Sequence, residues 1–578
     1  MSKIKPYILS VFLLISLHSC EDIFDKEPLD RISDAAVWNN PSLVQAYVTD
    51  LYARFPFFQF SNFTLVDKAT LTPNLNNQNV ITTGGMSHTS EGLGYWNYSL
   101  IRDLNFFIER IQDSEISPEL KAQLEGEVRT IRAVVYFEKQ KRYGAVPLVD
   151  VPLDPLAETD VKYLRRSSEE AVADFIDSEL TIAVGLLGTD ISQKGRINRY
   201  TAYAYKARAN LWAASIAKYG AVQLDGLVGI PATRANEFYE KAANAANAVI
   251  QAGRYQLYEK FSDRSENYRN IFIDDGNSEV IFERLYDGIN IGHGFSRDNH
   301  PTRFSDGIGS HTNPFLEFLL GYENIDGSAE QPLLGPDHLY ADGIDLFSKK
   351  DPRLRATVFL QGESFAGDII STYDGLDPNP QPDPAGIIAG VGVNHEGTPT
   401  VGQDGRYQDS HWVTGTGFLT RKYTSNTTFI PAGQETTSWK AVRLAEMYLT
   451  LAEAEFERGN LGPAATALNA TRTRAGISLV DETNITLDHV RTERKNELAF
   501  EGFRWWDLRR WRIARDVLQR QEKFNGLRII LHYETGQFYF FPWEAEPFTR
   551  VFREEHYYNP ITAARIENNS YLVENPGY

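Results

Sequence analysis

The chain has 578 residues with a formal net charge of −19, and 42% of its residues are hydrophobic. This hydrophobic share can bury a large core, whereas the acidic balance excludes the basic face that nucleic-acid binding requires. It also disfavours adsorption to an anionic membrane surface. The single cysteine, Cys20, excludes an intramolecular disulfide and a cysteine-based metal cluster.

Residues 1–19 have the pattern of a secretory signal peptide. Lys3 and Lys5 precede an apolar run over residues 7–17, which is too short for a comfortable transmembrane helix. Cys20 follows, and the end of the segment resembles a bacterial lipobox, in which the cysteine carries the lipid; His18 departs from the residue usual there. The alternative is an ordinary secretory signal with an incidental cysteine. We expect residues 20–34 to be the lipidated N-terminus and an acidic tether.

Apolar periodicity and capping residues predict helices in the first part of the folded chain. Ser33 or Asp34 can cap the first of them. Ser117 and Pro118 have the positions expected at the start of a long helix that ends at Gly144. The predicted helices cover residues 35–54, 95–111, 118–143, 168–187, 199–219 and 235–252.

Two segments lack this periodicity. Residues 55–94 are rich in Asn, Thr and Gly, and a loop of this length is usually functional or disordered. In residues 253–438 the content of Gly, Pro, Asp and Asn rises. There the sequence predicts only short elements, which are a helix over 314–320 and strands over 280–282 and 357–360.

The C-terminal part returns to helical patterning. Two helices are predicted within 442–476, with Gly459 in the left-handed conformation between them. Tyr448, Leu451, Ala452, Ala464 and Leu468 fit positions of the tetratricopeptide (TPR) pattern, a 34-residue helix pair. One such pair cannot bury its apolar face alone, so others are expected, with 199–219 and 235–252 as a candidate. A further helix over 487–519 and an irregular tail over 526–578 complete the prediction.

The sequence contains no phosphate-binding, zinc-protease or serine-hydrolase motif. His293, His300 and His311 share one loop region, but their spacing is not that of a metal site, and a polar loop surface is the more ordinary interpretation. The charged residues between Glu493 and Arg510 are expected to form helix-surface and interhelical ion pairs. The tryptophans at 505, 506 and 511 have helical spacing and are expected in the core.

Aromatic residues in the irregular segments suggest sugar binding. Sugars stack their C–H faces on aromatic rings, and their hydroxyls bond planar polar side chains. The alternative for each residue singly is that it packs its own loop. The aromatic residues are Phe57, Phe58, Phe60, Tyr286, Phe295, Phe304 and Trp412, and polar residues interleave with them at Asp67, Asn74, Asn76, His88, Arg297 and His300.

Several segments, in this order, resemble the SusD/RagB family of outer-membrane nutrient-uptake lipoproteins. The resemblance covers nearly the whole chain. It rests on the lipobox at Cys20, IRAVVYFEKQKRYGAVPLV at 131–149, DPRLRATV at 351–358, VRLAEMYLTLAEAEF at 442–456, ERKNELAFEGFRWWDLRRW at 493–511 and ENPGY at 574–578.

The resemblance implies a mostly α fold in which TPR-like helix pairs support a large irregular ligand-binding part. We expect a single domain over 35–578. Its helical scaffold would cover about 35–54, 95–252 and 440–520, with ligand-binding insertions at about 55–94 and 253–438. The resemblance also implies no enzymatic activity, a lipid-anchored position on the outer face of the outer membrane, and capture of oligosaccharides for a SusC-like TonB-dependent transporter.

In starch-binding members of the family, ligand residues come from two segments equivalent to the loop before residue 95 and the region 286–320. The resemblance therefore favours Asp67, His88, Tyr286, Phe295, His300 and Phe304 as ligand contacts. Neither 55–94 nor 285–313 contains a tryptophan, which disfavours a broad starch-like stacking surface. No cofactor or metal is expected; calcium in the Asp-rich loops stays open. The functional alternatives are a surface glycoside hydrolase or lyase and a TPR scaffold that binds peptide or protein.

Overall fold

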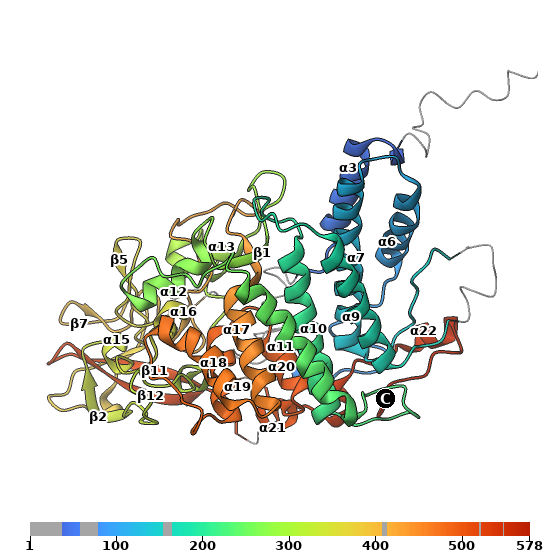
Figure 1. The fold of residues 1–578 in the computed structure, drawn as a ribbon. Coiled ribbons are helices and arrows are strands. Elements are labelled where there is room, and N and C mark those ends of the chain that lie inside the picture. The colour runs from blue at the N-terminus through green and yellow to red at the C-terminus, as the bar shows by residue number, and fades with distance from the viewer. Residues whose placement is uncertain (1–36, 58–78, 154–163, 407–412, 520–521, 547) are drawn as a thin grey trace, which may run out of the picture.

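The computed structural model describes residues 37–57, 79–153, 164–406, 413–519, 522–546 and 548–578. Figure 1 shows a helical half on the right and a loop-rich half on the left. A single hydrophobic cluster runs through both halves, from Trp38 to Leu572. Within these ranges no helix is both long enough and apolar enough to cross a membrane.

The first half of the chain builds a stack of helices. Helix α7 packs against α9, α9 against α10, and α10 against α11. Ser117 caps α7, because its Oγ accepts a hydrogen bond from the Leu120 amide at 3.3 Å, as its sequence position predicts. The helices are α3 Pro41–Ala53, α5 Asn79–Thr82, α6 Ser99–Arg110, α7 Pro118–Tyr143, α9 Glu169–Leu186, α10 Arg199–Tyr219 and α11 Ala235–Gln251, with 3₁₀ turns η2 Ile111–Asp113 and η3 Ala232–Arg234.

The N-cap predicted for the first helix is not tested, because Ser33 and Asp34 are not described. The first described helix, α3, is capped by Asn40, whose side chain accepts hydrogen bonds from the amides of Ser42 and Leu43. An Asn followed by Pro41 is an equally strong start signal, because proline fits the first helical position and needs no partner for its missing N–H.

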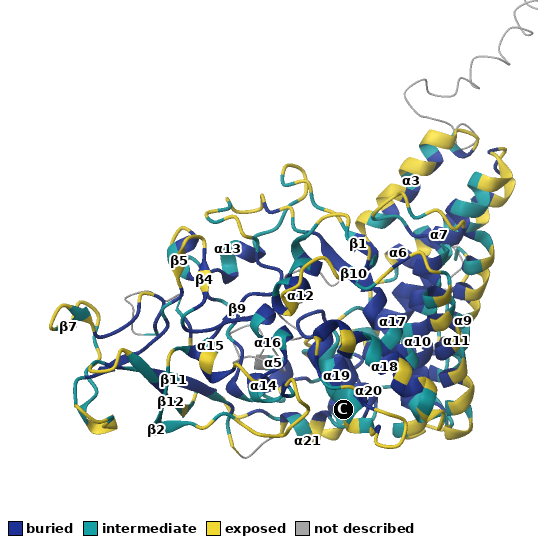
Figure 2. Ribbon diagram, turned by 60° about the vertical axis from the view of Figure 1, so that its left-hand side comes forward, coloured by how far each residue is buried: buried dark blue, intermediate teal, exposed yellow. Residues whose placement is uncertain are grey.

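The chain leaves the helical stack after α11 and returns to it at α17 Leu444–Glu457, which packs against α11. Helix α18 Leu461–Ala475 packs on α17 in turn. Gly459 between them has φ +85°, as predicted. Buried alanines such as Ala452 and Ala464 let the two helices approach closely. Figure 2 shows α10 and α17 dark blue in the interior of the stack.

The excursion between α11 and α17 is made of short elements. Helix α12, capped by Asp263, was not predicted, because the surrounding turn residues mask its short apolar period. The elements are α12 Arg264–Ile273, β1 Val280–Arg284, α13 Phe295–Asn299, η4 Thr302–Phe304, α14 Leu316–Leu320, β2 Gly335–Tyr340, α15 Gly343–Leu346, α16 Pro352–Thr357, β3 Val358–Phe359, β4 Ser364–Phe365, β5 Asp368–Ile369, β6 Gly375–Asp377, η5 Pro384–Gly386, β7 Asn394–His395, β8 Thr398–Pro399, β9 Leu419–Thr420 and β10 Trp439–Arg443.

The C-terminal tail is not irregular, contrary to the prediction. Strands β11 Asn525–His532 and β12 Gln537–Glu544 form an antiparallel hairpin that turns at Gly536, where φ is +66°. The hairpin is the centre of a four-stranded sheet in the order β2-β12-β11-β6. Runs of isoleucine and aromatic residues flanking a glycine turn are a strand signal, and this one was missed. The chain ends with η6 Glu554–Tyr557 and α22 Ala563–Asn568.

The helix predicted over 487–519 is broken into α19 Leu487–Glu497, α20 Arg504–Arg510 and α21 Ala514–Leu518. The first break lies at Phe500 and Gly502, whose φ values are +60° and +81°. Phe500 is fully buried against Phe318, so core packing holds its backbone in a conformation that a helix cannot continue through. The tryptophans at 505, 506 and 511 are buried, as predicted.

The charged residues of this region are buried rather than on a helix surface, which corrects the prediction, although they do pair between helices. Arg353, at the start of α16, contacts Glu493 at 2.6 Å, Glu497 at 2.7 Å and Asp351 at 2.6 Å, and all four side chains are completely buried. The network continues from Glu497 to Arg443 and Arg474, which both also contact Glu279.

The neighbouring arginines keep the buried Glu497 carboxylate ionised. Burial by itself would raise the pKa of Glu497, but the guanidinium groups of Arg474, Arg443 and Arg353 outweigh it and hold that pKa well below its usual range. The ion pairs therefore persist across the physiological pH range. They join α16, β10, α18 and α19, which are far apart in the sequence.

We expect Arg353→Met to lower the free energy of unfolding by about 3–5 kcal/mol, because it leaves the buried Asp351 carboxylate without its cation and removes one of the cations paired with Glu493 and Glu497. Arg54→Met is the matched control. Arg54 pairs with Asp50 and Asp103, but its side chain is 36% exposed, so the loss should be below about 1 kcal/mol. Urea unfolding followed by circular dichroism measures both. Similar small losses in the two variants would contradict the importance of the network.

Candidate functional site

A two-stranded ribbon connects the loop-rich half to the helical stack. Strand β1 pairs antiparallel with β10, and β10 runs directly into α17 (Figure 2). Phe282 of β1 is buried, and its ring stacks on that of Phe57 with centroids 5.3 Å apart. Phe55 packs edge-on against Phe282 at 5.4 Å. The end of the 37–57 segment is thereby fixed against the ribbon.

The aromatic cluster reaches the surface at the end of β1. The guanidinium of Arg284 lies 5.8 Å from the ring centre of Phe57 and 5.3 Å from that of Tyr286. Both Arg284 and Tyr286 are half-buried, and Leu285 between them is 47% exposed. A ring and a planar cation at the edge of the protein give a ligand a surface for stacking and a set of hydrogen-bond donors.

The loop after Tyr286 is held in place by the segment before β10. His293 and Glu435 exchange backbone hydrogen bonds of 3.4 and 3.2 Å. The Glu435 carboxylate accepts hydrogen bonds from the amide of Ser296, at 2.6 Å, and from its hydroxyl. The Tyr286 ring packs edge-on against the His293 ring at 4.7 Å. These contacts give Tyr286 a defined orientation.

Burial controls the charges in this loop. It lowers the pKa of His293 to about 4, so the imidazole is neutral at pH 7. Its Nε2 donates to the Thr437 carbonyl at 2.8 Å, and its Nδ1 accepts from the Phe295 amide at 3.2 Å. Burial also raises the pKa of Glu435 to about 7. The His293–Glu435 contact at 3.4 Å is therefore not a permanent ion pair.

Beyond this loop, α13 and η4 turn their large side chains inward. His300 is 1% exposed; its Nε2 donates to the Ser425 carbonyl at 2.9 Å, and its ring lies 5.0 Å from that of Phe365. Phe304 is 8% exposed and packs edge-on against Phe365 at 5.1 Å. Phe295 is 3% exposed. Neighbouring residues therefore cover most of the surface of these three rings.

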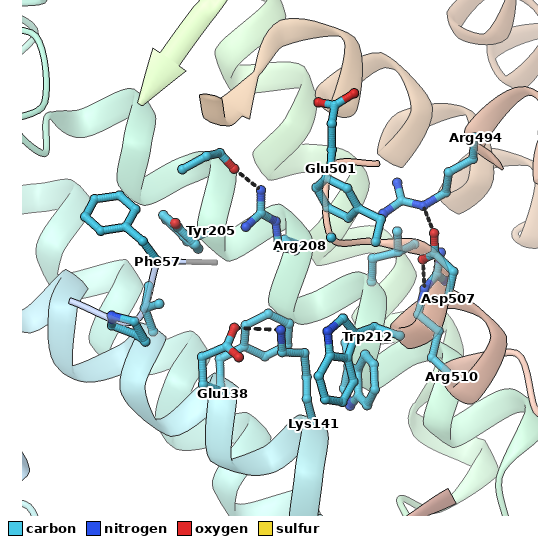
Figure 3. A pocket seen from close by; sticks show the side chains of 18 of the residues that line it. Phe57, Glu138, Lys141, Tyr205, Arg208, Trp212, Arg494, Glu501, Asp507 and Arg510 are labelled. Carbon is cyan, nitrogen blue, oxygen red and sulfur yellow. Dashed lines mark hydrogen bonds and ion pairs between the residues drawn. The ribbon is translucent and has the colours of Figure 1, made fainter. Parts of the chain in front are cut away.

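Two cavities lie apart from Tyr286. The first, of about 50 Å³, lies between α7, α10 and α20 (Figure 3), where Lys141 pairs with Glu138 at 2.6 Å and Arg494 with Asp507 at 2.9 Å. Its charges satisfy one another, which indicates a structural role. The second, of about 600 Å³, is mostly apolar and lies beside α22; its lining includes Trp96, Ile101, Val149, Leu164 and Leu572. Across the described ranges, no group of three or more His, Cys, Asp or Glu could hold a metal ion.

Comparison with known proteins identifies the family. The sequence profile of the SusD family matches residues 278–578, which is more than half of the chain. The chain belongs to the SusD family. A second profile, described as starch-binding and associating with the outer membrane, matches residues 29–211.

Similar proteins cover nearly all of this SusD-family chain. A SusD-like protein of Formosa agariphila is 24% identical and aligns with 91% of this chain and 95% of its own. The crystal structure of a SusD-like protein of Bacteroides fragilis has a TM-score of 0.72 at 25% identity, covering 96% of this chain and all of its own. A solved laminarin-binding SusD-like protein has a TM-score of 0.58 at 19% identity, covering 94% and 100%. The mostly α fold is thus confirmed.

The structure gathers some of the predicted ligand residues and separates others. Tyr286, Phe295, His300 and Phe304 lie along one stretch of the loop-rich half. His88 is exposed in a turn whose carbonyl accepts from the amide of Ala563, at the α22 end of the molecule (Figure 1). Asp67 and Cys20 lie outside the described residues. Ligand contact by the six candidates, and lipidation of Cys20, stay predictions.

Two residues of the site were missed. Arg284 ends a strand that the sequence predicts, and a cation two residues before Tyr286 was a usable signal. No such signal marks Glu435, because Ser296, in the loop that Glu435 holds, lies 139 residues earlier in the sequence.

His300 gives the stability of the protein a pH dependence. Burial lowers its pKa to about 4, below the 6.5 of an unfolded histidine, so its stabilising contribution is complete above pH 6.5. It is lost as the pH falls toward 4, by up to about 3 kcal/mol. His300→Gln should reduce the slope of unfolding free energy between pH 6.5 and 4.5, measured by urea titration. His88→Gln, at an exposed site, should leave it unchanged; equal slopes in all three proteins would refute this.

Proposed function

We propose that this protein is a non-catalytic glycan-binding lipoprotein of the bacterial cell surface. The observation that carries the proposal is the surface site of Arg284 and Tyr286, which lies over the buried ring of Phe57 at the end of the ribbon. Aromatic rings stack on sugars, and a guanidinium supplies hydrogen-bond donors for hydroxyl or acidic groups. Structural relatives named as a carbohydrate-binding SusD-like protein and a laminarin-binding one support this ligand class.

The proposal places the protein at the outer membrane, facing the cell exterior. Cys20 would carry lipid chains, and more than one chain gives stable anchoring. The family profile that mentions association with the outer membrane supports this location. The bound oligosaccharide would pass to a SusC-like TonB-dependent transporter, which is the partner implied by the family resemblance.

Affinity electrophoresis tests the proposal directly. The protein from residue 21 to 578 is run through gels that contain plant, fungal, bacterial or host polysaccharides, and the supernatant is examined for released sugars. Retardation by one polymer class without products is the expected result. Products that accumulate, and that disappear when a carboxylate is substituted, would identify a hydrolase or lyase. Retardation by none of the polymers, together with saturable peptide binding, would identify a peptide-binding scaffold.

Tyr286→Ala should weaken binding of the retained glycan by about fivefold, which corresponds to the ~1 kcal/mol expected for one stacking ring. Isothermal titration calorimetry with an oligosaccharide of that polymer measures the change. Tyr571→Ala is the control, because Tyr571 is also partly exposed, at 40%, but follows α22 at the other end of the molecule. An equal loss in both variants, or no loss in either, would exclude Tyr286 as a ligand contact.

A further inference from the structure

We propose that Arg284 binds an acidic group of the glycan, a carboxylate or a sulfate, so that the ligand of this protein is an anionic polysaccharide. This inference rests on the proposed function and adds the chemical class of the ligand. It follows from the surroundings of Arg284, from the cations of a pocket beside β1, and from how the nearby carboxylates are already engaged.

The guanidinium of Arg284 is held in position without a polar partner. Within the described ranges it makes no ion pair and no side-chain hydrogen bond, and its Nη1 is buried without a hydrogen-bond partner. The remaining donors of this half-buried side chain have no partner in the described part of the chain, so a ligand anion can bind them. By contrast, Arg353, at the start of α16, contacts three carboxylates.

Two rings lie beside the Arg284 guanidinium. Phe57 and Tyr286 both lie within 6 Å of the guanidinium, at 5.8 and 5.3 Å. A stacked guanidinium keeps its in-plane N–H groups free for a bidentate contact, which suits the two oxygens of a carboxylate or sulfate. The half-buried ring of Tyr286 offers stacking surface to the sugar that bears the acidic group, whereas Phe57 is buried beneath it.

A pocket that runs beside β1, from Gly276 before the strand to Glu283, carries two more cations. It has a volume of about 230 Å³, and Lys194 and Arg254 line it. The loop that carries Lys194 lies against the strand end, since a Cβ at Gly195 would be 3.3 Å from Leu285. Both cations are exposed, and neither makes an ion pair with a described residue. An extended acidic chain bound at Arg284 would find further positive charge in this pocket.

The carboxylates nearby are bound by groups other than Arg284. Glu283 lines the pocket, but Lys440 binds it at 2.8 Å and the Ser438 hydroxyl at 2.5 Å. Asp287, which follows Tyr286, accepts hydrogen bonds from the amides of Ile289, Asn290 and Ile291 within its own turn. Neither carboxylate pairs with Arg284, so no described carboxylate competes with a ligand anion for its guanidinium.

The test compares acidic polymers with neutral counterparts of the same backbone. The protein from residue 21 to 578 is run through gels with polygalacturonate, alginate, hyaluronate or dextran sulfate. The neutral counterparts are the carboxyl-reduced forms of the first three polymers, and dextran for dextran sulfate. We expect retention by at least one acidic polymer and none by its neutral counterpart. Polygalacturonate and dextran sulfate distinguish a carboxylate from a sulfate as the recognised group.

Arg284→Gln should weaken binding of the retained acidic polymer at least tenfold, and Arg284→Lys should weaken it less, because it keeps the charge but loses the bidentate contact. Arg515→Gln is the matched control, since it removes the same charge from an exposed side chain of α21, at the far side of the molecule from β1 (Figure 1). Thermal melting of the variants without ligand checks that each is folded.

Three results would overturn the inference. Binding of the acidic polymer that is equal in Arg284→Gln and the parent would exclude Arg284 as its contact. Retention by neutral polymers alone would exclude an acidic ligand while leaving the proposed glycan-binding function intact. Retention by no polymer of either kind would overturn the inference together with the proposed function.

Discussion

The buried ion network is the interaction on which the rest of the structure depends. Its charges have been taken out of water, so each is stabilised only while all its partners are in place. The partners come from segments that only the complete fold brings together, since Glu279 precedes β1, Arg353 begins α16, and Glu497 ends α19. These ion pairs fix the loop-rich half, which has few long elements, to the helical stack.

This constraint also positions the candidate site. Glu279 contacts Arg443 and Arg474 immediately before β1 begins, and Arg284 is the last residue of the same strand. Arg443 is the last residue of β10, so both strands of the ribbon are tied to the network at one end. At the other end of the ribbon, β1 ends at Arg284 and Tyr286 follows in the loop. Rigid elements that present variable loops are a common way to place a binding surface.

Sequence periodicity predicted the helices because their buried faces are set by neighbours in the stack, at spacings visible in the chain. It failed where distant contacts decide the backbone. Phe500 interrupts a strong helical pattern because its ring packs on Phe318, and no local signal reports that contact. At the candidate site, aromatic composition did not report exposure: Phe304 and His300 face inward, whereas the half-buried Arg284 was overlooked.

The strongly acidic composition makes the location of the unpaired cations informative. A protein with a net charge of −19 repels an anionic polymer at long range, although at physiological salt this repulsion fades beyond about 8 Å. Recognition of such a polymer must then come from cations at the contact itself, in surroundings that exclude water and strengthen the attraction. Arg284, half-buried beside two rings and without a carboxylate partner among the described residues, meets that requirement. A globally basic surface would bind polyanions indiscriminately, whereas one local site in an acidic protein selects those that also fit its rings.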